Sequence, residues 1–301
     1  MMNIVRGLAA SCLLLTCVAQ TATAADLGPT LQKIKDTGTI TIGHRESSVP
    51  LSYLDDSQTP IGFSIDLCTL VVDKLKADLS LPDLKVVYQP VNSSNRIPLV
   101  ENGTVDIECG STANTIPRQA QVAFSVTTFA PQFKWIALAS ARVNTTDDLK
   151  GKTVAVTQGT NTSQFVARLN TEKNLGMSIL QGKDHAESFL LVQTGRASAF
   201  MEDDILLAGL KANAKDPASL TFLSDAFPSD PYGLMISKSD PSFKKLVDDA
   251  LVAAMQSDTY DKLYTKWFES KIPPKGINLE FPMSDKLKAL VKTPSDKANG
   301  Q

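Results

Sequence analysis

A chain of 301 residues, of which 43% are hydrophobic, is long enough to bury a large core in one or two domains. Its 30 basic residues nearly balance its 32 acidic residues. This balance disfavours a nucleic-acid-binding surface and an acidic disordered tail, so we expect no nucleic-acid partner. It also makes any local cluster of arginines informative about function.

The first 24 residues have the pattern of a secretory signal peptide. Arg6 precedes an apolar segment over about residues 7–19, and small residues lead to a cleavage site after Ala24. The apolar segment is shorter than the roughly 20 residues that a membrane-spanning helix needs. We therefore expect removal of this segment on export, and a periplasmic, monomeric mature protein.

Cleavage removes Cys12 and Cys17 and leaves two cysteines, Cys68 and Cys109. An oxidising compartment permits one disulfide between them. Cys68 falls on a predicted helix and Cys109 at the end of a predicted strand, and the sequence does not say whether they lie close enough to pair. We favour two buried free thiols, with a single disulfide as the alternative.

Strand-like and helix-like segments alternate along the mature chain. In the first long helix, Leu67, Val71 and Leu75 recur at helical spacing and Asp66 lies in the first turn. Such alternation is typical of an α/β fold with mostly parallel sheets. The predicted strands span 39–45, 84–91, 105–110, 152–160, 177–182, 197–203 and 232–237. The predicted helices span 63–79, 94–103, 116–124, 145–151, 163–174, 185–195, 203–214, 241–258 and 260–270.

Polar residues gather where these strands end. Ligands of open α/β sheets bind beyond the carboxyl ends of the strands, so we expect these residues to face a ligand. Three of them are arginines, whose planar guanidinium groups offer paired donors suited to a carboxylate. The helix after Thr160 adds backbone N–H groups and a positive dipole end. The candidate ligand-binding residues are Arg45, Ser93, Arg96, Ser111, Thr112, Arg118, Thr160, Asn161, His185 and Asp203.

Six stretches of the mature chain resemble a known family. They are GHRESSVPLSY, SSNRIPLVENGTVDIECGST, VTQGT, KDHAESF, GRASAFMEDDILLAG and KWFESKIPPKGINLEF. The chain is similar to the periplasmic solute-binding proteins of family 3, most of all to the glutamate/aspartate-binding proteins of ABC importers. The resemblance implies a two-lobed, type II periplasmic-binding-protein fold with a two-stranded hinge. It places lobe 1 at 26–134 plus 230–301 and lobe 2 at 135–229.

The resemblance also implies a function and a division of roles in the site. A protein of this family captures an acidic amino acid by hinge closure and delivers it to a membrane permease, without a cofactor or a metal ion. Arg118 matches the arginine that holds the α-carboxylate, and Asp203 matches the aspartate that holds the ammonium group. The residues that match the side-chain carboxylate site are Arg45, Ser93, Arg96 and His185.

Two positions depart from the family pattern. The position of Ala113 usually carries Ser or Thr, and the position of Asn161 usually carries a hydroxyl. Both normally help to hold the α-carboxylate. The amide of Asn161 can still donate a hydrogen bond, whereas the methyl group of Ala113 cannot. The departures therefore concern the α-carboxylate end of the ligand, and the set that matches a side-chain carboxylate is intact.

The candidate arginines have structural alternatives. Arg45 could pair with Glu46 or Asp66 instead of a ligand. Arg96 could be a solvated residue in the first turn of its helix, and Arg118 could cap a neighbouring helix. We favour the ligand-binding interpretation because all three follow strands that end at the same predicted edge.

The other candidates also leave a choice. Only one carboxylate of the acidic cluster is expected to face the ligand; we favour Asp203, with Glu202 and Asp204 as alternatives. His185 could be a surface residue at the start of its helix. His44 alternates with the strand-ending arginine, so we expect it to face away and to be structural.

Two further functions fit the same fold. A few relatives are exported dehydratases, but two histidines in 301 residues are few for a metal site, and arginines transfer protons poorly because they stay protonated. Catalysis would need Glu46 or His185 as a general acid or base, so we expect no enzyme. The other alternative is a binding protein for another amino acid or a dicarboxylate, which feeds a sensor or a transporter.

Overall fold

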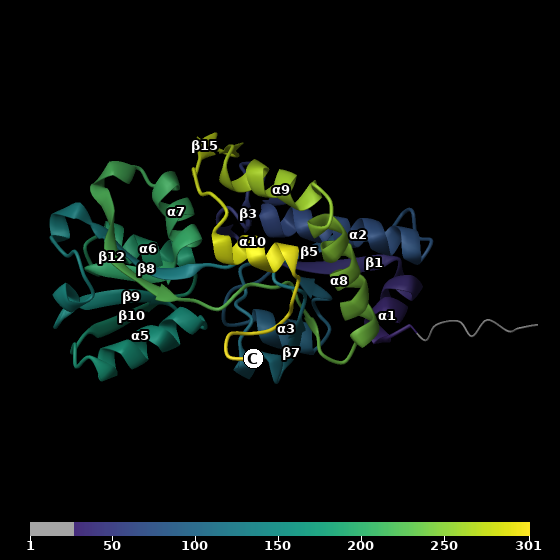
Figure 1. Cartoon of the computed structure of the whole chain (residues 1–301), viewed down its shortest axis with the longest axis horizontal. Helices are drawn as coiled ribbons and strands as arrows, with labels where there is room; N and C mark the ends of the chain where they lie inside the picture. The colour runs from purple at the N-terminus through teal and green to yellow at the C-terminus, as the bar shows by residue number, and fades with distance from the viewer. Residues whose placement is uncertain (1–26) are drawn as a thin grey trace, which may run out of the picture.

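The residues that the structure describes form two lobes, each built around one five-stranded sheet (Figure 1). The structure is a computed structural model that describes residues 27–301. The predicted signal peptide, residues 1–24, lies outside this range. The two sheets and their flanking helices confirm the two-lobed α/β fold class predicted from the sequence.

The sheet of the first lobe contains β1 (Thr39–His44), β5 (Lys85–Pro90), β6 (Ile107–Glu108), β7 (Val122–Phe124) and β13 (Met235–Ser237). The strands lie in the order β5-β1-β6-β13-β7, and only β13 runs against the others. Because β13 comes late in the sequence, both ends of the chain build this lobe. Two small sheets accompany it, made of β2 (Ser47–Ser48), β3 (Ser52–Leu54) and β4 (Pro60–Ile61), and of β14 (Lys271–Ile272) and β15 (Ile277–Asn278).

Helices pack around this first sheet. The apolar spacing of α2 (Phe63–Asp78) explains its packing, since Leu67, Val71 and Leu75 are completely buried. Asp66, in the first turn of α2, accepts a hydrogen bond of 2.7 Å from the indole N–H of Trp267 in α9 and so fixes the two helices together. The helices are α1 (Pro29–Thr37), α2 (Phe63–Asp78), α3 (Arg96–Glu101), α4 (Ile116–Gln119), α8 (Pro241–Met255), α9 (Thr259–Phe268) and α10 (Asp285–Lys292).

The sheet of the second lobe contains β8 (Gln132–Leu138), β9 (Thr153–Thr157), β10 (Ser178–Gly182), β11 (Ala199–Asp203) and β12 (Leu220–Pro228). Its order is β10-β9-β11-β8-β12, and only β8 runs against the others. Its helices are α5 (Asn161–Glu172), α6 (His185–Gln193) and α7 (Asp204–Asn213). Side chains cap two of them: Thr160 accepts from the backbone N–H of Ser163, and Asp184 accepts from that of Glu187.

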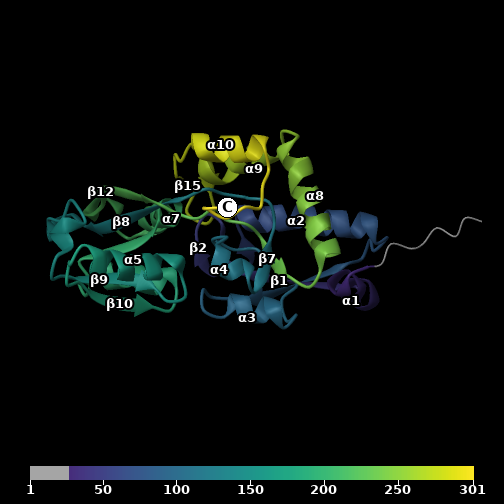
Figure 2. The same ribbon diagram turned by 60° about the horizontal axis from the view of Figure 1, so that its bottom comes forward.

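The chain crosses between the lobes along two neighbouring strands. It enters the second lobe along β8 and leaves along β12, and these strands pair antiparallel from Gln132 and Pro228 onward. Figure 2 shows both crossings side by side between the lobes. Paired crossings can act as a hinge because a rotation is absorbed at the same place in both segments.

The sequence patterns failed at several elements. The helix predicted over 116–124 is wrong in its second half, because α4 ends at Gln119 and Val122 and Phe124 alternate with Ala123 as buried residues of strand β7. The helix predicted over 145–151 is a single 3-10 turn, Asp147–Leu149. No element was predicted for β8, β12 or α10.

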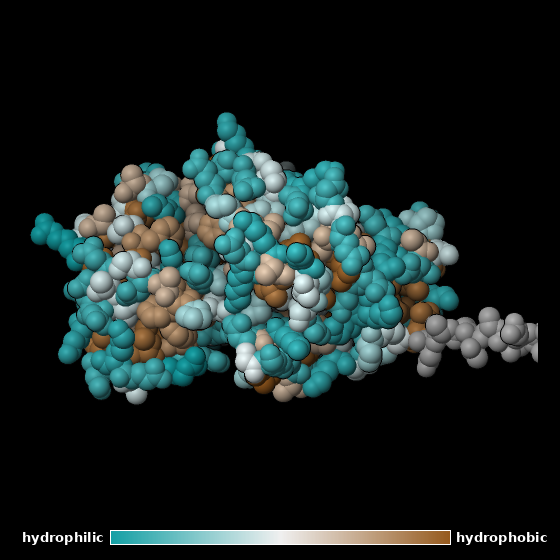
Figure 3. Space-filling view, viewed as in Figure 1, coloured by the Kyte–Doolittle hydropathy of each residue, from teal (hydrophilic) through white to brown (hydrophobic). Residues whose placement is uncertain are grey.

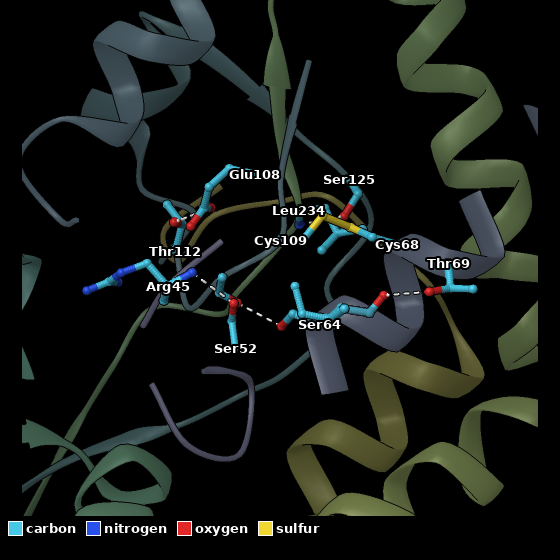
Figure 4. Close-up of a disulfide and its surroundings, with 12 residues drawn as sticks. Arg45, Ser52, Ser64, Cys68, Thr69, Glu108, Cys109, Thr112, Ser125 and Leu234 are labelled. Atoms are coloured by element: carbon cyan, nitrogen blue, oxygen red, sulfur yellow. Dashed lines mark hydrogen bonds between the residues drawn. A yellow bond between two sulfur atoms is a disulfide. The ribbon is translucent and has the colours of Figure 1, made fainter. Parts of the chain in front are cut away.

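The interpretation of Cys68 and Cys109 as free thiols is wrong. The two residues form a disulfide, with Cα atoms 6.3 Å apart, and both are completely buried (Figure 4). Cys68 lies in α2, and Cys109 directly follows β6. The disulfide therefore fixes the end of β6 against α2, next to the loop that carries Ser111 and Thr112.

None of the helices within residues 27–301 has the length and apolar character needed to cross a membrane. Figure 3 shows hydrophilic residues over most of one face of the molecule, with smaller hydrophobic areas on both lobes.

We expect the double substitution Cys68→Ala/Cys109→Ala to lower the free energy of unfolding by about 4 kcal/mol, because the disulfide closes a loop with a sequence separation of 41 in the unfolded chain. Urea denaturation followed by circular dichroism measures the change. Wild-type protein treated with a reductant is the control and should match the variant. Identical unfolding midpoints for the oxidised and reduced wild type would contradict the prediction.

Candidate functional site

The predicted site residues from both lobes lie at the facing ends of the two sheets. All of them are buried except Asn161, which is half-buried. Arg45, Arg96 and His185 are each no more than 2% exposed, although such side chains are rarely buried without a partner. The strand ends therefore converge on one enclosed polar cluster.

Two of the arginines meet at Ser111. Arg45 donates from Nη1 to the hydroxyl of Ser111 at 3.3 Å, and Arg96 donates from Nη1 to the carbonyl of the same residue at 3.3 Å. The backbone N–H of Arg45 donates to the hydroxyl of Ser52 at 2.9 Å, which holds the end of β1 in place (Figure 4). The alternative pairing of Arg45 with Asp66 does not occur, because Asp66 binds α9.

Glu108 is a buried carboxylate beside these arginines that the sequence analysis did not select. Its Oε1 lies 4.0 Å from Nη1 of Arg96, and its Oε2 accepts a hydrogen bond of 2.6 Å from the hydroxyl of Thr112. Figure 4 shows Glu108 and Thr112 side by side near Arg45. Thr112 therefore uses its hydroxyl to hold Glu108, and Glu108 in turn offsets part of the arginine charge.

Arg118 connects the two lobes. Its Nη1 donates to the carbonyl of Ala113 at 2.9 Å, and its Nη2 donates across the cleft to the carbonyl of Gly159 at 3.1 Å. Burial, followed by the charge of Arg96, lowers the pKa of Arg118 to about 9. The same two causes lower the pKa of Arg45 to about 10. Both groups stay protonated at neutral pH, so the positive charge of the cluster strongly favours a negatively charged partner.

His185 and Glu202 form the facing part of the cluster in the second lobe. Nδ1 of His185 lies 3.3 Å from Oε2 of Glu202 and makes a hydrogen bond of 3.1 Å with the hydroxyl of Thr157. Oε1 of Glu202 accepts a hydrogen bond of 2.9 Å from the hydroxyl of Thr162. Burial, together with the positive charges of the first lobe, lowers the pKa of His185. His185 is therefore a buried member of the cluster and not a surface residue.

The three adjacent carboxylates, Glu202, Asp203 and Asp204, have different surroundings. Asp203 accepts hydrogen bonds from the hydroxyls of Ser229, at 2.6 Å, and Tyr232. Burial and the charge of Glu202 raise the pKa of Asp203 well above its usual range. Asp204 instead lines a cavity of about 780 Å³ beside the hinge, together with aromatic residues. None of the three arginines of the cluster lines this cavity.

Thr160 and Asn161 lie at the edge of the cluster and bind elsewhere. The hydroxyl of Thr160 donates to the carbonyl of Thr157 at 2.7 Å and caps α5. The amide of Asn161 donates to the carboxylate of Asp230 at 3.2 Å. Their side chains are thus occupied, and what α5 offers the cluster is the N–H end of its first turn.

Buried polar atoms without a hydrogen-bond partner concentrate in this cluster. Within residues 27–301 there are six such side-chain atoms, and five belong to residues of the cluster. Buried polar groups are normally hydrogen-bonded, so an enclosed group of unpaired donors and acceptors suits a polar ligand. The five are Ser93 Oγ, Arg96 Nε, Glu108 Oε1, His185 Nε2 and Glu202 Oε2. Among the same residues, no group of histidine, cysteine, aspartate and glutamate side chains could hold a metal ion.

Two lobes that close over a polar cluster drawn from both of them define a class, the solute-binding proteins with a hinged cleft. Comparison of sequences agrees with this class. The chain belongs to the bacterial extracellular solute-binding proteins, family 3, which it matches over residues 40–270. The family resemblance noted in the sequence is thereby confirmed.

Known relatives extend over nearly the whole chain. The chain is 46% identical over 301 residues to an L-glutamate/L-aspartate-binding protein of Pseudomonas aeruginosa, with 100% of both chains covered. It is 45% identical over 271 residues to a glutamate/aspartate import solute-binding protein of Escherichia coli K12, with 90% of each covered. Among solved structures, it resembles an ancestral amino acid-binding protein that is a precursor of cyclohexadienyl dehydratase. That match has a TM-score of 0.68 and 27% identity, and it covers 79% of this chain and 99% of the other.

Sequence reasoning missed Glu108, Ser229 and Tyr232 as members of the site, and it gave Glu202 only as an alternative to Asp203. It selected residues at the ends of the predicted strands, whereas Glu108 lies inside the strand predicted over 105–110. In the structure Glu108 is the last residue of β6, directly before the disulfide-bonded Cys109. A glutamate within an otherwise apolar strand was the available signal, because such a residue is rarely buried without a positive partner.

Proposed function

We propose that this protein captures an acidic amino acid, L-glutamate or L-aspartate, and delivers it to the membrane permease of an ABC importer from the periplasm. The observation that carries the proposal is the burial of Arg45, Arg96 and Arg118 in one cluster. Three guanidinium groups in an enclosed site favour a ligand with two carboxylates over one with a single carboxylate. The names of the two relatives described above agree with this ligand class.

The roles of individual residues follow from the ligand's three charged groups. Arg118 and the first turn of α5 hold the α-carboxylate, and Asp203 accepts from the ammonium group while Ser229 and Tyr232 orient it. The ammonium group also supplies the positive charge that Asp203 needs to ionise. The side-chain carboxylate is held by Arg45, Ser93, Arg96 and His185, with Ser111 positioning the two arginines.

Lobe closure couples these contacts. The bonds of Arg118 to Gly159 and of Asn161 to Asp230 join the lobes near the cluster. Lys275 donates to the carbonyl of Asn213 at 2.6 Å at another point of contact. A ligand that touches both lobes therefore favours the closed state. We place the lobes at 26–134 plus 230–301 and at 135–229, which is supported by the sheet to which each strand belongs.

The departure at Ala113 has a local consequence. The carbonyl of Ala113 already accepts a bond from Arg118, so the backbone at this position still orients that arginine. The missing hydroxyl removes one donor for the α-carboxylate, and the charge of Arg118 carries that contact. We infer that the departure affects affinity more than ligand class.

Binding, and not catalysis, is the activity we propose. The cluster holds three arginines, and guanidinium groups stabilise anions but are poor at exchanging protons with a substrate. We propose that the protein acts as a monomer, without a cofactor or a metal ion.

The ligand class is tested by a thermal-shift screen of protein that has been unfolded and refolded to remove bound ligand. L-Glutamate or L-aspartate should bind with micromolar or tighter affinity, about −8 kcal/mol or better. At 100 times the dissociation constant, the ligand stabilises the fold by about 2.7 kcal/mol, which raises the melting temperature. If L-glutamine or L-arginine raises the melting temperature and neither acidic amino acid does, the proposed ligand class is wrong.

Substitution of two arginines separates the ends of the ligand. Arg118→Ala should abolish binding of acidic amino acids and of their amides alike, because both carry the α-carboxylate. Arg96→Ala should weaken L-glutamate more than L-glutamine, because it removes a donor for the side-chain carboxylate only. Calorimetric titration of both variants with both ligands decides this. If Arg96→Ala lowers the affinities for L-glutamate and L-glutamine by the same factor, the assigned division of roles is wrong.

Gly159 tests lobe closure. It has a positive φ of 77°, and a Cβ atom there would lie 2.7 Å from the carbonyl oxygen of Ser93 in the other lobe. Gly159→Ala should therefore weaken L-glutamate binding at least about tenfold, since a loss of 1.4 kcal/mol on closure suffices. Gly151→Ala is the matched control, because Gly151 has a φ of 72° with nothing within 4 Å of its Cβ position. Equal affinities of the two variants would show that the lobes do not close at this contact.

A further inference from the structure

We propose that Glu202 is a specificity-determining positioning residue, which holds His185 so that its Nε2 becomes an N–H donor to the ligand's side-chain carboxylate when the imidazole takes up a proton. Acidic ligands would thus bind together with a proton, and their amides without one. This inference rests on the proposed function and assigns the selectivity for acids over amides to a residue that touches the ligand only through His185.

The first step is the position of the proton on the neutral imidazole. The hydroxyl of Ser188 lies 2.9 Å from the carbonyl of Asp184 and 3.1 Å from that of Val156, and these groups can only accept. Its single proton is used there, so the Thr157 hydroxyl, 2.9 Å away, must donate to Ser188. Thr157 then accepts from Nδ1 of His185 at 3.1 Å.

Glu202 requires the same proton position. Its carboxylate lies 3.3 Å from Nδ1 and can only accept, so a proton on Nδ1 is favoured from this side as well. Glu202 is itself fixed by the Thr162 hydroxyl, at 2.9 Å, and by the backbone N–H of Asp203, at 3.2 Å. With Nδ1 protonated, the neutral ring has a bare lone pair on Nε2, which is buried and has no protein partner.

A bare Nε2 distinguishes an amide from a carboxylate. It can accept a hydrogen bond from the NH₂ group of an amide side chain, but it repels a carboxylate, which also only accepts. A carboxylate needs an N–H group on Nε2, and that requires the imidazolium form. The protonation state of His185 therefore selects between an acid and its amide.

The charges that face His185 control this protonation. Glu202 faces it from β11 and favours the imidazolium form, whereas Arg45 and Arg96 face it from the first lobe and oppose it. In the absence of an anion, burial followed by these opposing charges lowers the pKa of His185, so the ring is neutral at neutral pH. A bound carboxylate offsets the two arginines and leaves Glu202 dominant, which raises the pKa of His185 in the complex.

The charge balance of the closed site agrees with this mechanism. Three arginines and an imidazolium balance three ionised carboxylates and a ligand of net charge −1, which is the charge of an acidic amino acid. With a neutral imidazole, the same residues balance a ligand without net charge, such as an amide amino acid. Asp184 and Asp230 lie at the partly exposed margins of the site and are screened by water. The buried carboxylates of the site itself are Glu108, Glu202 and Asp203.

The sign of the pH dependence follows. Because the pKa of His185 is higher in the complex than in the free protein, affinity for an acidic ligand is greatest at low pH and falls as the pH rises through the pKa of the complex. Asp203 also changes its protonation on binding, but it meets the ammonium group of both ligand classes. The ratio of L-glutamine to L-glutamate dissociation constants therefore isolates His185.

The experiment measures this ratio by calorimetry between pH 6 and pH 8 for the wild type, Glu202→Gln and Asp204→Asn. In the wild type we expect the preference for L-glutamate to fall as the pH rises, by up to about tenfold per pH unit. Glu202→Gln should reduce the preference at least about tenfold at pH 6 and flatten the profile. Asp204→Asn removes the same charge two residues further along the chain, beside the hinge cavity, and should keep the wild-type profile.

A measurement on the ligand-free protein is independent of the ligand. The chain has only two histidines, so ¹⁵N NMR of untagged protein resolves His185 once His44→Gln has assigned the spectrum. We expect a proton on Nδ1 in the neutral ring and a lower His185 pKa in Glu202→Gln. A proton on Nε2 of the neutral ring, or a wild-type acid preference that does not change with pH, would overturn the inference. If no acidic amino acid binds the wild type at any pH, the proposed function itself is wrong.

Discussion

Burying Arg45, Arg96 and Arg118 in one cluster brings three like charges out of water, and this costs free energy unless negative groups compensate it. Glu108 supplies part of the compensation from the first lobe, and Thr112 holds it there. The rest comes from the second lobe and from the ligand. Much of the architecture around the cleft can be understood as a means of placing these charges.

The position of the first-lobe charges depends on how the ends of the parallel strands are fixed. Arg45 directly follows β1 and its backbone is held by Ser52, and the cysteine that is bonded to α2 directly follows β6. The strand end that carries Glu108 is thus attached covalently to the longest helix of the lobe. A site that must hold like charges a few ångströms apart benefits from such rigid support.

The sequence was a good guide wherever a residue's role follows from its place along a strand. Asp203 ends β11 and Arg45 directly follows β1, so the rule that ligands bind beyond strand ends predicted both at this edge, and both are buried in the cluster. The same rule gave Thr160 and Asn161 a side-chain role, whereas one caps a helix and the other binds Asp230. Local patterns do not show which long-range partner a polar side chain will find.

Long-range pairing also explains what was missed in the fold. β8 ends at Leu138 and β12 begins at Leu220, so the two strands pair over a long sequence separation and neither has a local signal of its own as a hinge strand. The disulfide joins residues with a sequence separation of 41, and only the packing of α2 against β6 decides that they meet. Glu108 was overlooked, and Glu202 was given only as an alternative to Asp203, for a related reason. Glu108 acts on Arg96, and Glu202 acts on His185. Each of these partners comes from another element of the fold, so the sequence around the glutamate does not reveal it.

Charge and motion are connected in this molecule. Closure removes water from the cleft, and the lower local dielectric strengthens both the repulsion among the arginines and their attraction to an anion. Without an anion, closing increases the cost of the buried positive charge. In the proposed mechanism, a dicarboxylic ligand makes the same movement favourable, because Arg118 and the first turn of α5 would then meet the ligand from the two lobes that the bond of Arg118 to Gly159 joins. The ligand thus brings the compensating negative charge, so its binding favours the closed state.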